Sequence, residues 1–138
     1  MNAALDAARE HVGRLLASAG VPAEPDGNGG FTIPHGPTTV FVAISETDGP
    51  VLIEIWAPVL AHVALTPDLF RYAAETSFLF GRLCVARTAD ATGQLQLSQA
   101  LVADPLTEEV LIQVLGSVAN TAADLASTLP ATFPPPPP

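Results

Sequence analysis

The sequence predicts an α+β fold in which an antiparallel sheet of five strands carries its helices on one face. Three observations lead to this prediction. Segments with apolar residues every three or four positions alternate with segments rich in β-branched residues. Their order along the chain is helix, three strands, helix, two strands and helix, or αβββαββα. Turns of hairpin length join consecutive strands, and such short connections are typical of antiparallel pairing.

The first helix is expected over residues 2 to 19. Leu5, Val12 and Leu16 belong to an apolar stripe with helical spacing, and the charged residues lie largely on other faces. Gly20 and Pro22 should end this helix, because glycine accepts the left-handed conformation at a helix C-terminus and proline cannot continue a helix.

Three strands should follow as a meander, over residues 31 to 33, 38 to 45 and 51 to 57. The second and third of these segments are β-branched and apolar. Clusters of proline, glycine, aspartate and asparagine precede and separate the segments, which is the composition of tight turns.

The second half of the chain predicts a helix, a hairpin and a final helix. Thr66-Pro67-Asp68 is a helix start, with a capping hydroxyl, a proline in the first turn and an acid near the positive end of the dipole. This helix is expected to run to about Phe80. Strands at 82 to 87 and 94 to 101 should form the hairpin, and Thr107 should cap the last helix.

Side-chain alternation along the strands divides the sheet into two faces. One face is uniformly apolar and should pack under the helices: Val40, Val42, Ile44, Val51, Ile53, Ile55, Leu83, Val85, Leu95 and Leu97. The other, here called the outer face, is mixed: Phe41, Ala43, Leu52, Glu54, Trp56, Cys84, Ala86, Gln94, Gln96 and Ser98.

The outer face is the candidate binding site because it is unusually apolar for an exposed surface. Fully burying one large apolar side chain is worth roughly 1.5 to 3 kcal/mol, which an isolated subunit would leave unused. We expect Phe41, Leu52 and Trp56 to anchor a partner or peptide, with Glu54 and Ala86 beside them. The alternatives are that a loop or the tail of the same chain covers this face, or that its apolar residues are scattered and harmless.

Aromatic residues in the second predicted helix suggest a dimer interface. Phe70, Tyr72 and Phe78 are spread around much of its circumference, and one sheet cannot cover every side of a helix. The alternative is that the aromatic end of the helix is simply buried in the core.

Composition and motifs exclude several functions. Fourteen acidic against five basic residues give a formal net charge of −9, which would repel nucleic acid and anionic membranes. His11, His35 and His62 lack metal-ligand spacing, and a single cysteine, Cys84, builds neither a disulfide nor a thiolate cage. No catalytic constellation and no cofactor motif is found. We therefore expect a non-enzymatic protein. Because the sequence shows neither a signal peptide nor a spanning segment, we expect this protein in the cytoplasm.

The domain is expected to end at residue 130, and residues 131 to 138 to form a disordered proline-rich tail. Prolines cannot join a helix or a central strand, so they should form a solvated polyproline II segment. Phe133 and the prolines after it also resemble the ligands of EVH1-type domains.

Strings at the element boundaries carry a resemblance to a known family. They are Trp56-Ala57-Pro58-Val59-Leu60, Thr66-Pro67-Asp68-Leu69, Phe80-Gly81-Arg82-Leu83, Gly93-Gln94-Leu95-Gln96-Leu97, Thr107-Glu108-Glu109-Val110-Leu111 and Ala123-Asp124-Leu125. In this order, over residues 3 to 130, the chain resembles the YbjN-like proteins. These are bacterial relatives of the type III secretion chaperones, and the actinobacterial branch is described as peptide-binding chaperones.

The resemblance implies a small α+β domain, often dimeric, that holds an extended segment of another protein and has no catalytic residue. A client segment could dock its side chains on the outer face or add a strand at a sheet edge. The alternative function is a structural or regulatory homodimer that uses the same face for self-association and has no peptide client.

Overall fold

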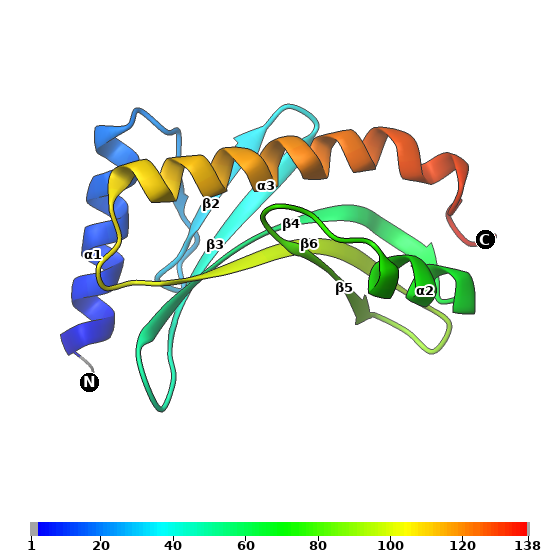
Figure 1. The fold of residues 1–138 in the computed structure, drawn as a ribbon, viewed down its shortest axis with the longest axis horizontal. Helices are drawn as coiled ribbons and strands as arrows, with labels where there is room; N and C mark the ends of the chain where they lie inside the picture. The colour runs from blue at the N-terminus through cyan, green and yellow to red at the C-terminus, as the bar shows by residue number, and fades with distance from the viewer. Residues whose placement is uncertain (1–2, 138) are drawn as a thin grey trace.

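The computed structural model describes residues 3–137 and contains three α-helices, six strands and a short 3₁₀ helix (Figure 1). In chain order these are α1 (Ala3–Ser18), β1 (Glu24–Pro25), β2 (Phe31–His35), β3 (Thr38–Glu46), β4 (Val51–Ala64), α2 (Pro67–Glu75), β5 (Arg82–Arg87), β6 (Thr92–Val102), α3 (Glu108–Thr128) and η1 (Leu129–Ala131).

The strands form one antiparallel sheet with the order β1-β2-β3-β4-β6-β5. The predicted α+β class and the antiparallel sheet are therefore confirmed, with one strand more than the five expected. The extra strand, β1, pairs only two residues, Glu24 and Pro25, with β2. A strand of two residues is too short to show alternation, so the sequence pattern does not reveal it.

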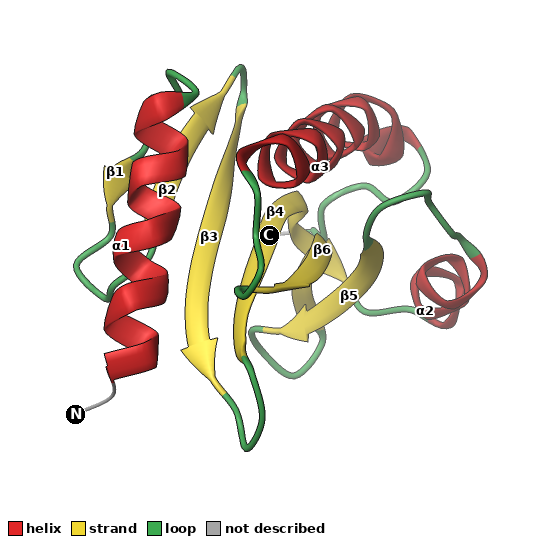
Figure 2. Cartoon of the chain, turned by 60° about the vertical axis from the view of Figure 1, so that its left-hand side comes forward, coloured by secondary structure: helices red, strands yellow, loops and turns green. Residues whose placement is uncertain are grey.

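Helices α1 and α3 pack on the same face of the sheet (Figure 2). The sheet contributes the predicted apolar set to the core, where Val40, Ile53 and Leu97 have no exposed surface. The buried side chains of α1 and α3 complete this core: Ala8, Val12 and Leu16 from α1, and Leu111, Val114, Leu115, Val118, Ala119 and Ala122 from α3. α2 lies at the other end of the molecule from α1, next to β5 (Figure 1).

Both predicted helix caps are present. The Thr66 hydroxyl accepts a hydrogen bond from the Leu69 amide at 3.2 Å, and the Thr107 hydroxyl accepts one from the Val110 amide at 3.2 Å. These bonds satisfy amides that have no partner within the helix, so the two helix starts could be read correctly from sequence.

α2 ends at Glu75, and the expectation that it runs to about Phe80 is wrong. The Thr76 backbone is extended, and its amide closes the helix on the Tyr72 carbonyl. The following residues alternate like an extended chain: Phe78 and Phe80 pack against the core, and Leu79 is 89% exposed. Burying two aromatic rings from an extended segment outweighs the helical propensity of the sequence.

Strand β4 continues to Ala64, seven residues beyond the predicted end at Ala57. The prediction stopped before Pro58 because proline has no amide to donate in a central strand. In the structure, β4 pairs with both neighbours only up to Trp56, and from Ala57 onward it pairs with β6 alone, through two irregularities in register. Pro58 is tolerated because β3 is no longer hydrogen-bonded there.

By length and composition alone, one helical segment within residues 3–137, Glu108–Ala131, could cross a membrane. Its buried residues, such as Leu111 and Val118, pack on the sheet. The core helix of a globular domain meets the same criteria.

Candidate functional site

The outer face has the composition that the alternation predicts. One row across the sheet consists of Thr32, Phe41, Trp56, Ser98 and Arg82, from β2, β3, β4, β6 and β5. Trp56 therefore lies directly across from Phe41, and Ser98 is buried between the longer side chains of Trp56 and Arg82.

Phe41 and Trp56 form the aromatic centre of this face. Their ring centroids lie 4.4 Å apart and their planes differ by 19°, which is a stacked arrangement. Both side chains are half-buried, and neither belongs to the partly buried residues that pack against the core. Since the two rings pack against each other rather than against the core, their outer surfaces stay available to a partner.

The remaining candidates lie on either side of the stack. Leu52 and Glu54 precede Trp56 on β4, with Leu52 half-buried and Glu54 exposed. Ala86 lies at the other end of the face, on β5 and opposite Gln94. Leu52 pairs with Val102 and Ala86 with Gln94 of the same strand, β6. The two residues are therefore eight positions apart along the strands, which is roughly 27 Å at about 3.4 Å per residue.

A pocket adjoins the stack at the point where β3 and β4 separate. It has a volume of about 560 Å³ and is lined by uncharged residues from β3, the turn before it, β4 and α3: Pro37, Thr38, Thr39, Phe41, Pro58, Val59, Ala61, Ala123, Ala126 and Ser127. The Thr38 hydroxyl donates to the Pro58 carbonyl at 3.4 Å across this separation. Sequence reasoning missed the pocket, although Pro58 within a long apolar segment was a sign of interrupted pairing.

The predicted dimer residues do not share one surface. Phe70 lies on α2 and is 45% exposed, whereas Tyr72 is half-buried and packs against the core and Phe133. Phe78 lies in the loop after α2 and packs against the core. The interpretation that all three follow one helix is therefore wrong, and Phe70 remains the exposed aromatic of α2.

The C-terminal segment does not cover the outer face. Phe133 lies against Tyr72 of α2, with ring centroids 5.5 Å apart, and packs against the core. This differs from the expectation of a tail that is solvated from residue 131 onward. It also removes one explanation for the apolar outer face, namely that Phe133 sits on it.

Within residues 3–137, no cluster of three or more His, Cys, Asp or Glu side chains could hold a metal ion. Two of the histidines have hydrogen-bond partners: His11 donates to the Leu106 carbonyl at 2.8 Å, and His35 lies 3.0 Å from the Asn120 side-chain oxygen. Cys84 is half-buried on the outer face, opposite Gln96.

Solved structures with the same fold come from several organisms. YbjN of E. coli, a proposed transcription regulator, has 15% identity and a TM-score of 0.62, with 93% of this chain and 96% of that one covered. The Yersinia pestis type III secretion chaperone SycH, in complex with a fragment of YscM2, has 14% identity and a TM-score of 0.60, with 86% and 98% covered. An uncharacterized Methanothermobacter thermautotrophicus protein has 12% identity and a TM-score of 0.50, with 91% and 99% covered.

At identities this low, the structural similarity shows the fold alone, and a sequence-family model shows the family. No curated protein sequence matches the chain. The family model for peptide-binding chaperones of the type III secretion (YopN, CesT) and YbjN group matches residues 6–134, which is nearly the whole chain. The resemblance carried by the boundary strings is thereby confirmed, and the chain belongs to the TY-Chap1 family, T3SS (YopN, CesT) and YbjN peptide-binding chaperone 1.

Proposed function

We propose that this protein is a non-enzymatic chaperone that holds an extended segment of a client protein on the outer face of its sheet. The observation that carries the proposal is the Phe41–Trp56 stack, which stands on the sheet face opposite α1 and α3. Aromatic side chains are enriched in protein interfaces, because they bury a large area at little cost in conformational entropy.

The dimensions of the face suit a short extended segment. A separation of roughly 27 Å along the strands from Leu52 to Ala86 corresponds to about eight residues of extended chain. Apolar client residues would contact Leu52, the stack and Ala86, and the pocket beside Phe41 would take one further apolar side chain. Glu54 and Arg82 flank Trp56 with opposite charges and would favour one orientation of the client.

Side-chain docking is better supported than strand addition. The strand order leaves β5 as a full-length edge strand, whereas β1 at the other edge has only two residues. Arg82 and Arg87 are exposed at the two ends of β5. Charged side chains on an edge strand discourage pairing with another chain, so we place the client on the face rather than along this edge.

The alternative function is a structural or regulatory homodimer that uses the outer face for self-association and has no peptide client; a second copy would then cover the half-buried Phe41–Trp56 stack. A dimer through the exposed apolar surface near α2, where Phe70 and Leu79 are 45% and 89% exposed, is a separate arrangement. It is compatible with client binding, since these residues lie outside the outer face. We place the protein in the cytoplasm, and the charge of −9 argues against nucleic acid and anionic membranes as partners.

The test is a selection of random dodecapeptides on the purified full-length protein, followed by titration of the selected peptides. Trp56 is the only tryptophan, so its emission should shift to the blue when an apolar peptide covers it. Phe41→Ala should weaken binding by at least ~2 kcal/mol, the usual loss when an aromatic anchor is truncated.

Val110→Ala is the matched control, because Val110 is an exposed apolar residue of α3, away from the outer face. It should leave the peptide affinity unchanged. Selected peptides that bind the wild type and Phe41→Ala equally well would refute the proposed site.

A further inference from the structure

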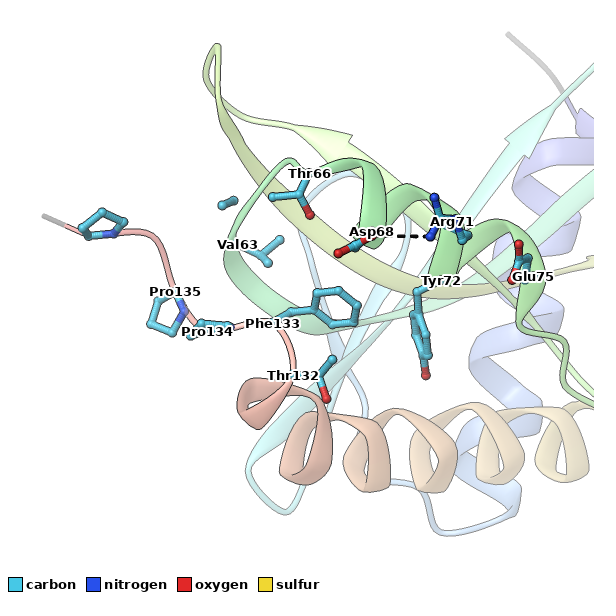
Figure 3. Close-up of a pocket in the computed structure, with 12 residues that line it drawn as sticks. Val63, Thr66, Asp68, Arg71, Tyr72, Glu75, Thr132, Phe133, Pro134 and Pro135 are labelled. Carbon is cyan, nitrogen blue, oxygen red and sulfur yellow. Dashed lines mark ion pairs between the residues drawn. The ribbon is translucent and has the colours of Figure 1, made fainter.

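The C-terminal segment folds back onto α2. After α3, the 3₁₀ helix η1 turns the chain, and the amides of Thr132 and Phe133 both donate to the Leu129 carbonyl, at 2.9 and 2.8 Å. The Phe133 side chain then points toward α2, and the prolines lead away from it (Figure 3). The turn therefore places one aromatic side chain, that of Phe133, against α2, and the proline run follows it in the chain.

The surface that receives Phe133 contains an aromatic residue in a suitable position. Tyr72 meets Phe133 in a tilted arrangement, with ring planes 55° apart and centroids separated by 5.5 Å. This lies within the range in which aromatic pairs attract each other beyond simple burial. Phe133 is half-buried rather than enclosed, so it occupies a surface site and not an interior position.

The contact beyond Phe133 is incomplete. A pocket of about 670 Å³ lies between the tail and α2, lined on one side by Pro134, Pro135 and Pro137. Its other side includes Asp68, Arg71 and Glu75 of α2, with an exposed ion pair of 3.6 Å between Asp68 and Arg71. Phe133 is thus the main anchor of the tail, and the exposed Pro134, Pro135 and Pro137 border a partly open groove.

A proline run has no internal hydrogen bonds to lose and is already extended before it binds. Release of the tail would therefore cost chiefly the contacts of Phe133. The tail thus combines an aromatic ring bound at the surface with a preformed polyproline segment. Such a tail can dissociate from α2 and bind to it again at little conformational cost.

We infer that the α2 surface around Tyr72 is a second recognition site, specific for an aromatic residue followed by prolines, and that the chain's own tail occupies it. The partner is a segment of another protein that also has an aromatic residue followed by prolines, and it must displace Phe133 before it binds. We infer this partner sequence from the tail, which binds the site in the structure. The site lies on α2 and at the end of β4, apart from the outer face, so it does not depend on the proposed client site.

The tail lowers the apparent affinity for such a partner by competition. A tethered segment has an effective concentration of the order of millimolar. If the separate segment binds with a dissociation constant of roughly 100 μM, the tail should weaken apparent binding about tenfold. Phe133→Ala removes this competitor without changing the α2 surface.

The experiment measures fluorescence anisotropy of a labelled peptide, ATFPPPPP, titrated with full-length chains. Phe133→Ala should bind this peptide about tenfold more tightly than the wild type does. Peptide ATAPPPPP should bind neither chain, and the double variant Tyr72→Ala/Phe133→Ala should lose binding of ATFPPPPP. The single variant Phe133→Leu, which keeps an apolar anchor in the tail, should lie between the wild type and Phe133→Ala.

Several results would overturn the inference. Equal affinity of the wild type and Phe133→Ala would show that the tail does not compete. Binding of ATAPPPPP as tight as that of ATFPPPPP would remove the aromatic requirement. Loss of the folded far-ultraviolet circular dichroism spectrum in Phe133→Ala and Phe133→Leu would make Phe133 part of the core. A wild-type dimer that Phe133→Ala converts to a monomer would assign the site to tail exchange between two copies.

Discussion

Truncating Trp56 to alanine tests whether Trp56 is a binding residue on the outer face or a residue of the core. Trp56 is half-buried, stacks on Phe41 and does not pack against the core. The loss of the ring pair accounts for roughly 0.5 to 1.5 kcal/mol, and the loss of partial burial adds a little more. We therefore expect Trp56→Ala to lower the free energy of unfolding by about 1 to 2 kcal/mol.

A buried tryptophan would behave differently, because truncating a core aromatic residue costs roughly 3 to 5 kcal/mol. Leu95→Ala provides the internal comparison, since Leu95 is fully buried on the other face of the same sheet. Its truncation should cost about 2 to 5 kcal/mol, the range for leucine in a packed core.

The assay is urea unfolding followed by far-ultraviolet circular dichroism, which does not depend on the tryptophan that is removed. The wild type should also show red-shifted tryptophan emission, as expected for a partly exposed indole. If Trp56→Ala loses more than about 3 kcal/mol and the wild type already emits in the blue, the assignment of Trp56 to an open face is refuted.

Three further predictions concern the dimer, a helix cap and a glycine. Light scattering should give about twice the chain mass of 14.2 kDa, and Phe70→Glu should halve it without unfolding the protein; a wild-type monomer at tens of micromolar would contradict this. Thr66→Ala should lower stability by about 1 kcal/mol in thermal or urea unfolding, because the Leu69 amide loses its acceptor; an unchanged stability would show that water replaces the cap. Gly81→Ala should lower the free energy of unfolding in urea by about 1 to 3 kcal/mol, since Gly81 has φ +98° and an added Cβ would lie 3.1 Å from Leu97 Cδ1. An unchanged free energy of unfolding would contradict this prediction.

Local rules predicted the features that depend on short stretches of sequence. Alternation placed Phe41 and Trp56 on the outer face, and hairpin geometry placed them near each other. The threonine caps at residues 66 and 107 were visible because capping needs only a hydroxyl three residues before its donor. These features form within one helix turn or one hairpin, so one sequence carries enough information to identify them.

Features that depend on contacts between distant segments could not be predicted in this way. The end of α2 at Glu75 is set by burial of Phe78 and Phe80, and a local pattern does not show which surface will bury them. The position of Phe133 depends on Tyr72, more than fifty residues earlier in the chain. The extension of β4 past Pro58 required knowing that β3 leaves its side at that point.

The separation of β3 from β4 has a consequence for how the domain unfolds. Beyond the Phe41–Trp56 pair, the sheet divides into one part built on β2 and β3 and another built on β4, β6 and β5. Helix α3 packs on β3, β4 and β6 and so joins both parts (Figure 1). Detachment of α3 would expose apolar surface on both parts, although α1 still packs on β3 and β4. The domain should therefore melt in a single cooperative transition, with the amides of α3 around Val118 among the slowest to exchange with solvent.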